Sequence, residues 1–367
     1  MRLPVSSSVR MGAWILRNRL SPRPEWQRDP KPKEEPFPIL GSRPPEGGPT
    51  PPHPLLRRRF PLVLMLEPLH ACNLTCTGCG RIREYEETIT DRLPLKRCFE
   101  AMDECGAPIV SICGGEPMMY KPIGALVRGA IERKRHVYLC TNGMFITARL
   151  HEFRPDQQFF FNVHLDGMRE THDRAVEREG VFEAAIEGIR AAKAAGHMVC
   201  TNTTVYRETD MEEVEELFGH LQQFDVDGHM LSPAYGYSAV DSREIFLTRM
   251  EIQEKFRHVD RLFRRFRMNT TPAYAEFLKG NRDMPCTAWG NPTFNTRGWK
   301  GPCYLITDAH WDTFEDLMCE TPWASYGRGN DQRCEHCMVH CGYEPSAALG
   351  VNARLGDSLR MLRWALT

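Results

Sequence analysis

The sequence predicts an α/β protein built on a parallel sheet. Short apolar runs rich in β-formers recur from residue 61 onward, and amphipathic helical patterns lie between most of them. These runs are apolar almost throughout, which is typical of strands that are covered on both faces. Six such units fit a partial barrel or a doubly wound sheet, and a chain of 367 residues also leaves room for a smaller second domain.

The predicted strands and helices alternate along the chain. The strands cover residues 61–66, 108–113, 136–141, 159–165, 198–205 and 228–233. Among the helices between them are residues 95–106, 181–196 and 211–224, of which the last two have clear apolar spacing at i, i+3 and i+4. We therefore expect a barrel domain over residues 59–240 and a helical, cysteine-rich domain over residues 241–367.

The first 58 residues have a different composition. Residues 9–20 place Trp14, Ile15 and Leu16 among arginines, which predicts a short amphipathic helix within residues 1–20. This helix either packs on the body of the protein or contacts an anionic membrane, where each basic side chain adds about 1 kcal/mol. Residues 21–58 are rich in proline and predict a disordered or polyproline-like linker.

Composition limits the partners and the compartment. The formal net charge of −1 gives no reason to expect nucleic acid as a partner. No run approaches the ~18 apolar residues of a membrane span, and the first apolar run lacks the features of a signal peptide. The 14 cysteines cluster at short spacings, which favours metal binding in a reducing compartment. We expect a cytoplasmic protein with peripheral contact at the inner face of the membrane.

Polar motifs follow the predicted strands at their carboxyl ends. Because parallel strands end at the same edge of a sheet, side chains at these positions converge, and this edge is where α/β proteins bind ligands. The candidates are Cys72, Cys76 and Cys79 after the first strand, Gly114, Gly115 and Glu116 after the second, and Asn142, Asp166 and Asn202 near later strand ends.

The three cysteines of residues 72–79 form a C-x3-C-x2-C loop. Soft thiolates select zinc or iron–sulfur clusters, and a zinc site needs a fourth ligand close by. The next 12 residues contain neither cysteine nor histidine. A [4Fe–4S] cluster bound by three cysteines leaves one iron with an open coordination position for a substrate. The loop therefore favours such a cluster, and zinc with a distant ligand is the alternative.

This loop, followed one strand later by GGEP at residues 114–117, resembles the radical S-adenosylmethionine (SAM) superfamily. The resemblance implies a partial (β/α)6 TIM-like barrel in which SAM completes the coordination of a [4Fe–4S] cluster. The cluster, supplied with electrons by a donor such as flavodoxin or ferredoxin, cleaves SAM to a 5′-deoxyadenosyl radical. Gly114, Gly115 and Glu116 would lie close to SAM, as glycine permits close backbone approach.

The resemblance also implies that Asn142, Asp166 and Asn202 contact the ribose and the carboxylate of SAM, although Asn and Asp are ordinary turn formers too. One position departs from the superfamily. Gly78 stands where an aromatic residue often lies against the adenine. The adenine must then be held by another group or less tightly.

The C-terminal cysteines resemble the auxiliary-cluster extension (SPASM/Twitch type) of the same superfamily. This resemblance implies a second iron–sulfur cluster, and the alternatives are a zinc site that uses His336 or His340, or no metal. Four other cysteines, Cys98, Cys105, Cys200 and Cys319, fall in helical or strand patterns and are expected in the core. The candidate ligands of the second cluster are Cys286, Cys303, Cys334, Cys337 and Cys341.

Longer matches over most of residues 59–345 resemble the adenosylhopane synthase family of hopanoid biosynthesis. The resemblance implies that the deoxyadenosyl radical adds to the alkene of diploptene, a triterpene, so that SAM is consumed as a substrate. The alternative is an auxiliary-cluster enzyme that abstracts hydrogen from another terpenoid or from a peptide. In the first case a product radical needs a hydrogen atom, and we predict Cys140 as its donor, with Cys113 as the rival. Either thiol is otherwise a small buried hydrophobe.

Overall fold

The computed structural model describes residues 12–13, 59–350 and 356–366. Gly12 and Ala13 are helical and exposed. The rest of the predicted helix at residues 9–20, and the whole predicted linker at residues 21–58, lie outside the described residues.

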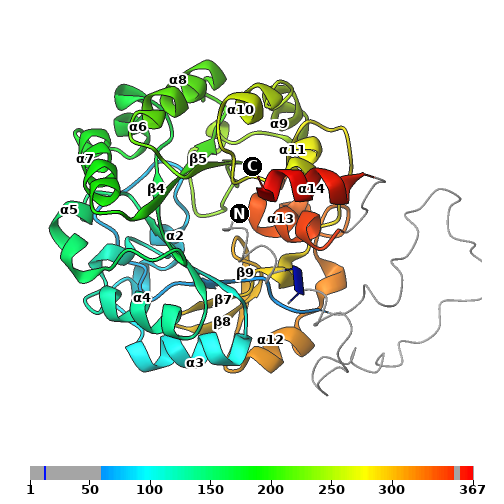
Figure 1. Cartoon of the computed structure of the whole chain (residues 1–367). Coiled ribbons are helices and arrows are strands. Elements are labelled where there is room, and N and C mark those ends of the chain that lie inside the picture. Colours follow the sequence, from blue (N-terminus) through cyan, green and yellow to red (C-terminus); the bar gives the residue numbers. More distant parts are fainter. Residues whose placement is uncertain (1–11, 14–58, 351–355, 367) are drawn as a thin grey trace, which may run out of the picture.

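Six parallel strands stand side by side in chain order, from β1 to β6. Helices follow the strands and ring their outer side (Figure 1). A doubly wound sheet would reverse its strand order, so this sequential order is that of a partial barrel. The strands are β1 Val63–Leu66, β2 Ile109–Ile112, β3 His136–Thr141, β4 Phe159–His164, β5 Met198–Val205 and β6 Gly228–Pro233. The predicted α/β fold with its parallel sheet is confirmed, and all six predicted strands are present.

The helices between the strands agree with their sequence patterns. The predictions at residues 95–106, 181–196 and 211–224 correspond to α3, α7 and α8. Helix α3 ends at Gly106, whose φ of 69° is the left-handed conformation that glycine adopts readily. The helices of the barrel are α2 Arg81–Glu84, α3 Leu95–Cys105, α4 Ile123–Glu132, α5 Ile146–Arg149, α6 Arg169–Ala175, α7 Val181–Ala194 and α8 Met211–Gln222.

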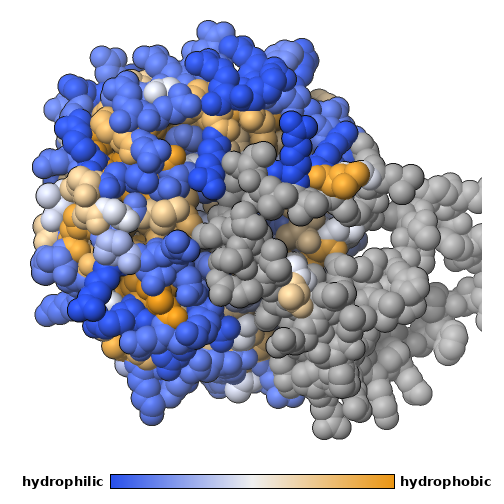
Figure 2. All heavy atoms as spheres, viewed as in Figure 1, coloured by the Kyte–Doolittle hydropathy of each residue, from blue (hydrophilic) through white to orange (hydrophobic). Residues whose placement is uncertain are grey.

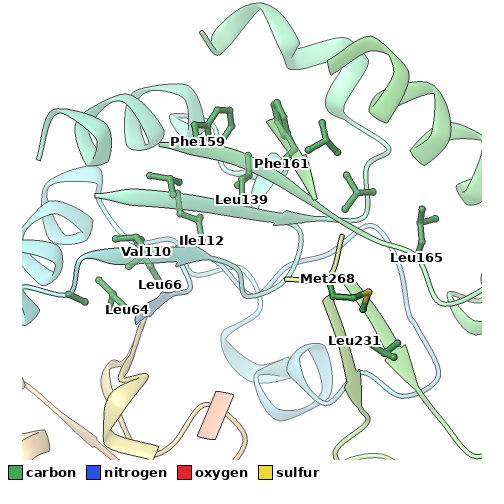
Figure 3. Close-up of a cluster of buried hydrophobic side chains, with 14 of the residues drawn as sticks. Leu64, Leu66, Val110, Ile112, Leu139, Phe159, Phe161, Leu165, Leu231 and Met268 are labelled. Atoms are coloured by element: carbon green, nitrogen blue, oxygen red, sulfur yellow. The ribbon is translucent and has the colours of Figure 1, made fainter. Parts of the chain in front are cut away.

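Both faces of the parallel strands are buried. Leu64, Leu66, Val110 and Ile112 point outward into the main core between the sheet and the helices (Figure 3). The alternate residues face the barrel interior, because successive strand side chains point to opposite faces. A smaller interior cluster is formed by residues such as Val63, Met65, Ile109, Tyr138 and Phe160. Burial on both faces explains why the strands read as continuous apolar runs.

Three further strands extend the sheet beyond β1. Strand β7 (Thr293–Asn295) pairs in parallel with β1, and β8 (Gly298–Pro302) and β9 (Thr307–Trp311) follow in antiparallel order. Pairing with β7 removes the free edge that β1 would otherwise present. The sheet therefore crosses the boundary that we predicted at residue 240, and division of the chain at that residue stays a prediction. Strands β7 to β9 are short and, unlike β1, are interrupted by polar residues and glycine, so no apolar run marks them in the sequence.

Short helices complete the C-terminal part of the structure. They are α9 Arg249–Lys255, α10 Asp260–Arg265, α11 Pro272–Leu278, α12 Phe314–Glu320, α13 His340–Ala348 and α14 Asp357–Leu366. The outer helices present mainly hydrophilic residues on the face seen in Figure 2. Within the described ranges, every helix is too short or too polar to cross a bilayer.

Burial of His229 makes the stability of the barrel dependent on pH. Its ring on β6 stacks on Phe218 of α8 with centroids 4.1 Å apart, and its Nδ1 lies 2.7 Å from Thr201 Oγ1. Burial lowers the pKa of His229 from 6.5 to about 3. As the pH falls from 7 to 5, His229 is therefore protonated in the unfolded chain but stays neutral in the native protein. The free energy of unfolding falls as a result.

Between pH 7 and pH 5, we expect the free energy of unfolding to fall by about 2 kcal/mol less in His229→Gln than in the wild type, because glutamine does not titrate. Urea denaturation at a series of pH values measures this difference. His151→Gln, at an exposed histidine, is the matched control and should follow the wild type. An unchanged pH dependence in His229→Gln would contradict the assignment.

Candidate active site

The interior face of the barrel opens into a cavity of about 320 Å³ at the carboxyl ends of the strands. We call it the reaction cavity. Five neighbouring strands or the residues just after them each contribute two side chains that are two positions apart, because alternate residues share one face. These pairs are Ser111 and Cys113, Tyr138 and Cys140, Asn162 and His164, Asn202 and Thr204, and Met230 and Ser232.

The loop that carries Cys72, Cys76 and Cys79 forms one wall of the reaction cavity. Burial, together with the neighbouring Glu116 and Cys79, raises the pKa of Cys72 to about 12. Burial likewise raises the pKa of Cys76, with added repulsion from Cys79 and Cys72. The sulfurs are thus close enough to repel one another as thiolates. The thiolate forms are favoured here only when a bound cation compensates their charge.

Hydrogen bonds to the backbone carbonyls and N–H groups of this loop hold it in a fixed shape. The guanidinium of Arg83 donates to the carbonyls of Cys76 and Cys79, at 3.1 Å and 2.5 Å. The backbone N–H of Leu74 donates to Sγ of Cys72 at 3.4 Å, which is a charge-stabilising contact for a thiolate.

Three thiols on one cavity wall are the donor set that was predicted for a [4Fe–4S] cluster. In such a cluster each ligating cysteine binds a different iron, and the fourth iron is left open toward the cavity. Within the described part of the chain, no three His, Cys, Asp or Glu side chains are placed to hold a metal ion. Zinc with a distant ligand stays the alternative.

Gly114 and Gly115 permit the close approach of two backbone segments. A Cβ at Gly114 would collide with the carbonyl of Leu69, and one at Gly115 would collide with the carbonyls of His70 and Ala71. The N–H groups of Gly115 and Glu116 donate to Leu69 and Ala71 at 3.1 Å and 2.9 Å. The sequence predicted close approach to a ligand, whereas the glycines first serve to seat the segment that leads into the cysteine loop.

Glu116 connects this segment to the end of β3. Its carboxylate accepts hydrogen bonds from the backbone N–H groups of Met118 and Asn142 and from Thr141 Oγ1, each at 2.8 Å. Burial raises the pKa of Glu116 to about 7, against the effect of these donors. The side chain of Asn142 donates to Asn73 Oδ1 at 2.8 Å, so the end of β3 is bonded to the cysteine loop as well.

Asp166 lies behind the wall of the cavity rather than on it. Its carboxylate accepts from the N–H of Thr204 at 2.8 Å and lies 2.8 Å from His164 Nε2. His164 and Asn202 do line the cavity, and they contact each other at 3.5 Å. We predicted direct contact between Asp166 and SAM. That contact stays a prediction. The structure shows Asp166 placed to orient His164, a residue that the sequence analysis missed although it lies two positions from Asp166.

Tyr206 fills the space next to Gly78. A Cβ at position 78 would collide with the phenol ring of Tyr206, which follows β5 and lines the reaction cavity. In the same way, the ring of Tyr237 occupies the side-chain space of Gly80. The aromatic group that the loop lacks at residue 78 is thus supplied by a segment more than a hundred residues away, which a motif search cannot detect.

Both candidate hydrogen donors line the reaction cavity. Cys140 Sγ lies 3.3 Å from Ser111 Oγ and 3.5 Å from Asn162 Nδ2. Cys113 is the more deeply buried of the two, and burial raises the pKa of both thiols. Both groups therefore remain thiols at neutral pH, as hydrogen-atom donation requires.

The five C-terminal cysteines come together in a second cavity, which we call the cysteine cavity. Cys286 Sγ lies so close to Gly342 that a Cβ there would collide with it. His336 and His340 lie elsewhere, His340 on the wall of the reaction cavity. The cysteines that line the cysteine cavity are Cys286, Cys303, Cys334, Cys337 and Cys341. The donor set fits a thiolate-bound cluster, and the two histidines do not contribute to it.

Comparison with known proteins identifies two segments. Residues 66–221 match the radical SAM superfamily, and residues 229–361 match a domain of unknown function (DUF3463). The first match runs from the end of β1 through β2 to β5 and nearly to the end of α8, with the cysteine loop and GGEP inside it, whereas nearly all of β6 falls in the second match.

Curated relatives agree with this assignment. The chain is 28% identical over 206 residues to the GTP 3′,8-cyclase of Thermodesulfovibrio yellowstonii, covering 52% of this chain and 62% of that protein. It is 29% identical to the AdoMet-dependent heme synthase of Methanosarcina barkeri, covering 43% and 46%, and 26% identical to the Fe-coproporphyrin III synthase of that organism, covering 41% and 39%. The chain thus spans less than two thirds of each of these relatives.

Solved structures share the fold. SuiB of Streptococcus suis bound to S-adenosylmethionine superimposes with a TM-score of 0.61 at 17% identity, over 76% of this chain and 71% of SuiB. A structure of anSMEcpe with bound AdoMet and a peptide gives 0.53 at 15% identity, over 83% and 97%. Family model and fold together support the radical SAM superfamily, whose members use a [4Fe–4S] cluster and SAM, and the cysteine-rich extension fits a second cluster. None of the relatives named here is a hopanoid enzyme, so the finer resemblance stays a prediction.

We predict that the ring of Tyr206, which lies beside Gly78 on the wall of the reaction cavity, stacks on the adenine of SAM. We expect Tyr206→Ala to weaken SAM binding about tenfold, because aromatic stacking on a base contributes about 1–3 kcal/mol. Anaerobic calorimetry on the iron-loaded protein measures the affinity. Tyr206→Phe keeps the ring and should bind as the wild type does. Wild-type affinity in Tyr206→Ala would show that the ring does not contact the adenine.

Proposed function

We propose that this chain, which carries a radical SAM domain over residues 66–221, cleaves SAM reductively and directs the adenosyl radical to a substrate in the reaction cavity. A [4Fe–4S] cluster at Cys72, Cys76 and Cys79 supplies the electron when bound. One observation carries the proposal: the cysteine loop, the GGEP segment and the interior ends of β2 to β6 all line a single cavity. A one-electron donor such as flavodoxin or ferredoxin provides the electrons.

As the specific reaction we propose addition of the adenosyl group to the alkene of diploptene, which gives adenosylhopane. Apolar side chains suited to a hydrocarbon line the cavity beside the thiols, among them Met65, Tyr138, Met230 and Leu305. Addition forms one C–C bond and leaves a tertiary carbon radical. Cys140 then gives its S–H hydrogen atom to that carbon, and the resulting thiyl group recovers an electron from the reductant and a proton from solvent. Burial raises the pKa of Cys140, so the side chain stays a neutral thiol that carries the hydrogen to be donated.

The second candidate is hydrogen abstraction from another terpenoid or from a peptide by an auxiliary-cluster enzyme. The relatives favour it, since those named above are heme, coproporphyrin and GTP-cyclising enzymes. The cysteine cavity also supports it, because five thiols are gathered there. In this case 5′-deoxyadenosine leaves the enzyme and Cys140 has no part in the chemistry.

Product analysis separates the two candidates. Anaerobic incubation of the iron-loaded protein with SAM, a reductant and diploptene should give methionine and a product whose mass is the sum of diploptene and the adenosyl group. Free 5′-deoxyadenosine without such an adduct would favour hydrogen abstraction. The triple variant Cys72→Ala, Cys76→Ala, Cys79→Ala should cleave no SAM. If the wild type forms no deoxyadenosyl product of any kind, it is not a radical SAM enzyme.

The role of Cys140 gives a further prediction. Cys140→Ala should lose most of the saturated adduct and accumulate alkene or rearranged products, because the carbon radical no longer meets a thiol. Mass spectrometry of the lipid products detects the change. Cys200→Ala is the matched control, since Cys200 is buried on the same sheet but does not line the cavity.

Unaltered yields in Cys140→Ala would rule out Cys140 as the donor. If Cys113→Ala alone causes the loss, the donor is Cys113, whose thiol lines the same cavity.

A further inference from the structure

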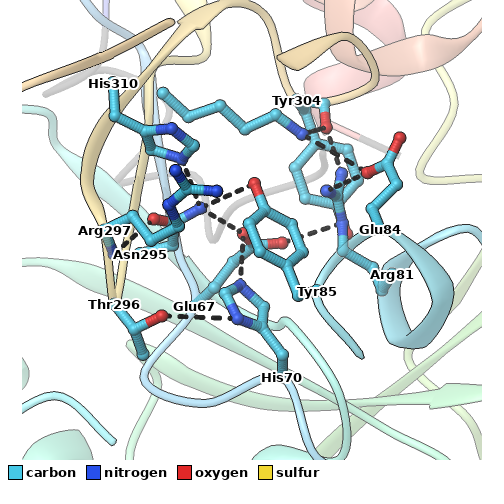
Figure 4. Close-up of polar contacts among 11 residues, drawn as sticks. Glu67, His70, Arg81, Glu84, Tyr85, Asn295, Thr296, Arg297, Tyr304 and His310 are labelled. Atoms are coloured by element: carbon cyan, nitrogen blue, oxygen red, sulfur yellow. Dashed lines mark hydrogen bonds and ion pairs between the residues drawn. The ribbon is translucent and has the colours of Figure 1, made fainter. Parts of the chain in front are cut away.

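Two buried cations converge on the backbone carbonyl of Tyr304, the residue that follows Cys303. Lys300 lies on β8 with its side chain fully buried, and Arg81 begins α2 with 3% of its surface exposed. Lys300 Nζ donates to the backbone carbonyl of Tyr304 at 2.8 Å, and the guanidinium of Arg81 donates to the same oxygen. Figure 4 shows Arg81 beside Tyr304, with Glu67 and Glu84 close to its guanidinium.

Tyr304 separates the two cysteine sites. It lines both the reaction cavity and the cysteine cavity, and the guanidinium of Arg81 lies 4.3 Å from the centre of its ring. Arg81 also follows Cys79 by two positions, while Lys300 precedes Cys303 by three. The cation pair therefore stands between the cysteines of the first loop and those of the second cavity.

Two carboxylates balance these cations from the far side. Arg81 Nε lies 2.9 Å from Glu67 Oε1, and Glu84 Oε2 lies 3.2 Å from Arg81 and 3.9 Å from Lys300. Because Tyr304 directly follows Cys303, the carbonyl that both cations hold lies one residue from a candidate ligand of the second cluster.

We propose that Lys300 and Arg81 raise the reduction potential of the cluster bound by the C-terminal cysteines. An electron added to a buried cluster increases its negative charge, and cations nearby in a medium of low polarity stabilise that reduced state. Burying a lysine costs more than burying a methionine of similar length, so packing alone does not require a charge at position 300. The inference rests on the second cluster proposed above.

The potential of this cluster can be measured in isolation. The triple variant Cys72→Ala, Cys76→Ala, Cys79→Ala removes the first site and serves as the parent protein. After anaerobic reconstitution, iron and sulfide analysis counts the remaining cluster, and a dye-mediated redox titration followed by EPR gives its midpoint potential. Added to this parent, Lys300→Met should shift the midpoint to a more negative value.

Lys255→Met is the matched control. Its side chain is half-buried and its ammonium likewise donates to backbone carbonyls, those of Arg207 and Thr209 at 2.7 Å and 2.6 Å, but neither of these residues adjoins a candidate ligand of the second cluster. This variant should leave the midpoint unchanged. A shift equal to that of Lys300→Met would mean that loss of any buried lysine causes it, and would overturn the inference.

Glu84→Gln tests the same idea with the opposite sign. Glu84 is half-buried, so its replacement is compatible with folding, and loss of its charge leaves the two cations less compensated. The midpoint should become more positive. This variant also decides the question if Lys300→Met fails to fold or to hold iron. A loaded cluster with no shift in either variant refutes the inference alone, whereas a parent without iron refutes the second cluster and the inference with it.

Discussion

The close contact between the backbone of residues 69–71 and Gly114–Gly115 is the constraint on which the active site depends. Two backbone hydrogen bonds join the segments, and a Cβ on either glycine would collide with a carbonyl oxygen. The contact fixes the chain one residue before Cys72. Glu116 then carries the constraint to β3 through its bonds to Thr141 and Asn142. The cysteine loop is thereby positioned by strand ends that belong to the rigid core.

A buried ion network extends the same constraint to the C-terminal part of the chain. Glu67 at the end of β1 pairs with Arg81, and its pKa falls to about 2 because Arg81, His70 and Lys300 outweigh the effect of burial. Removing Glu67 would leave Arg81 buried without its closest counter-charge, which typically costs about 3–5 kcal/mol. Since Lys300 comes from β8, the network assembles only when β7 to β9 have joined the sheet.

The sequence predicted those features that repeat or that lie close together in the chain. Continuous apolar runs gave the six strands, and the cysteine loop and GGEP located the edge where the cavity opens. Asn162 and His164 were missed because their role depends on which face of β4 they occupy. The signal was present in FFFNVHL, where these two polar residues stand two positions apart and so share one face of the strand. Strand β7 and Tyr206 were beyond reach for another reason. Each acquires its place only through a distant segment, β1 for the former and Gly78 for the latter.

Contacts between segments that are distant in the sequence also link the two cysteine sites. Tyr304 belongs to the extension, yet its carbonyl is held by Arg81 from the first loop and by Lys300 from β8. Arg81 begins α2 just after the cysteine loop and Lys300 lies on β8, so a shift of either segment relative to Tyr304 would break a buried charged hydrogen bond, and such bonds contribute about 1.5–3 kcal/mol each. The extension is therefore a part of the active-site wall and not an independent module. The barrel without it would lose the Tyr304 and Leu305 side of the reaction cavity, and Arg81 would lose the carbonyl of Tyr304 as a hydrogen-bond acceptor.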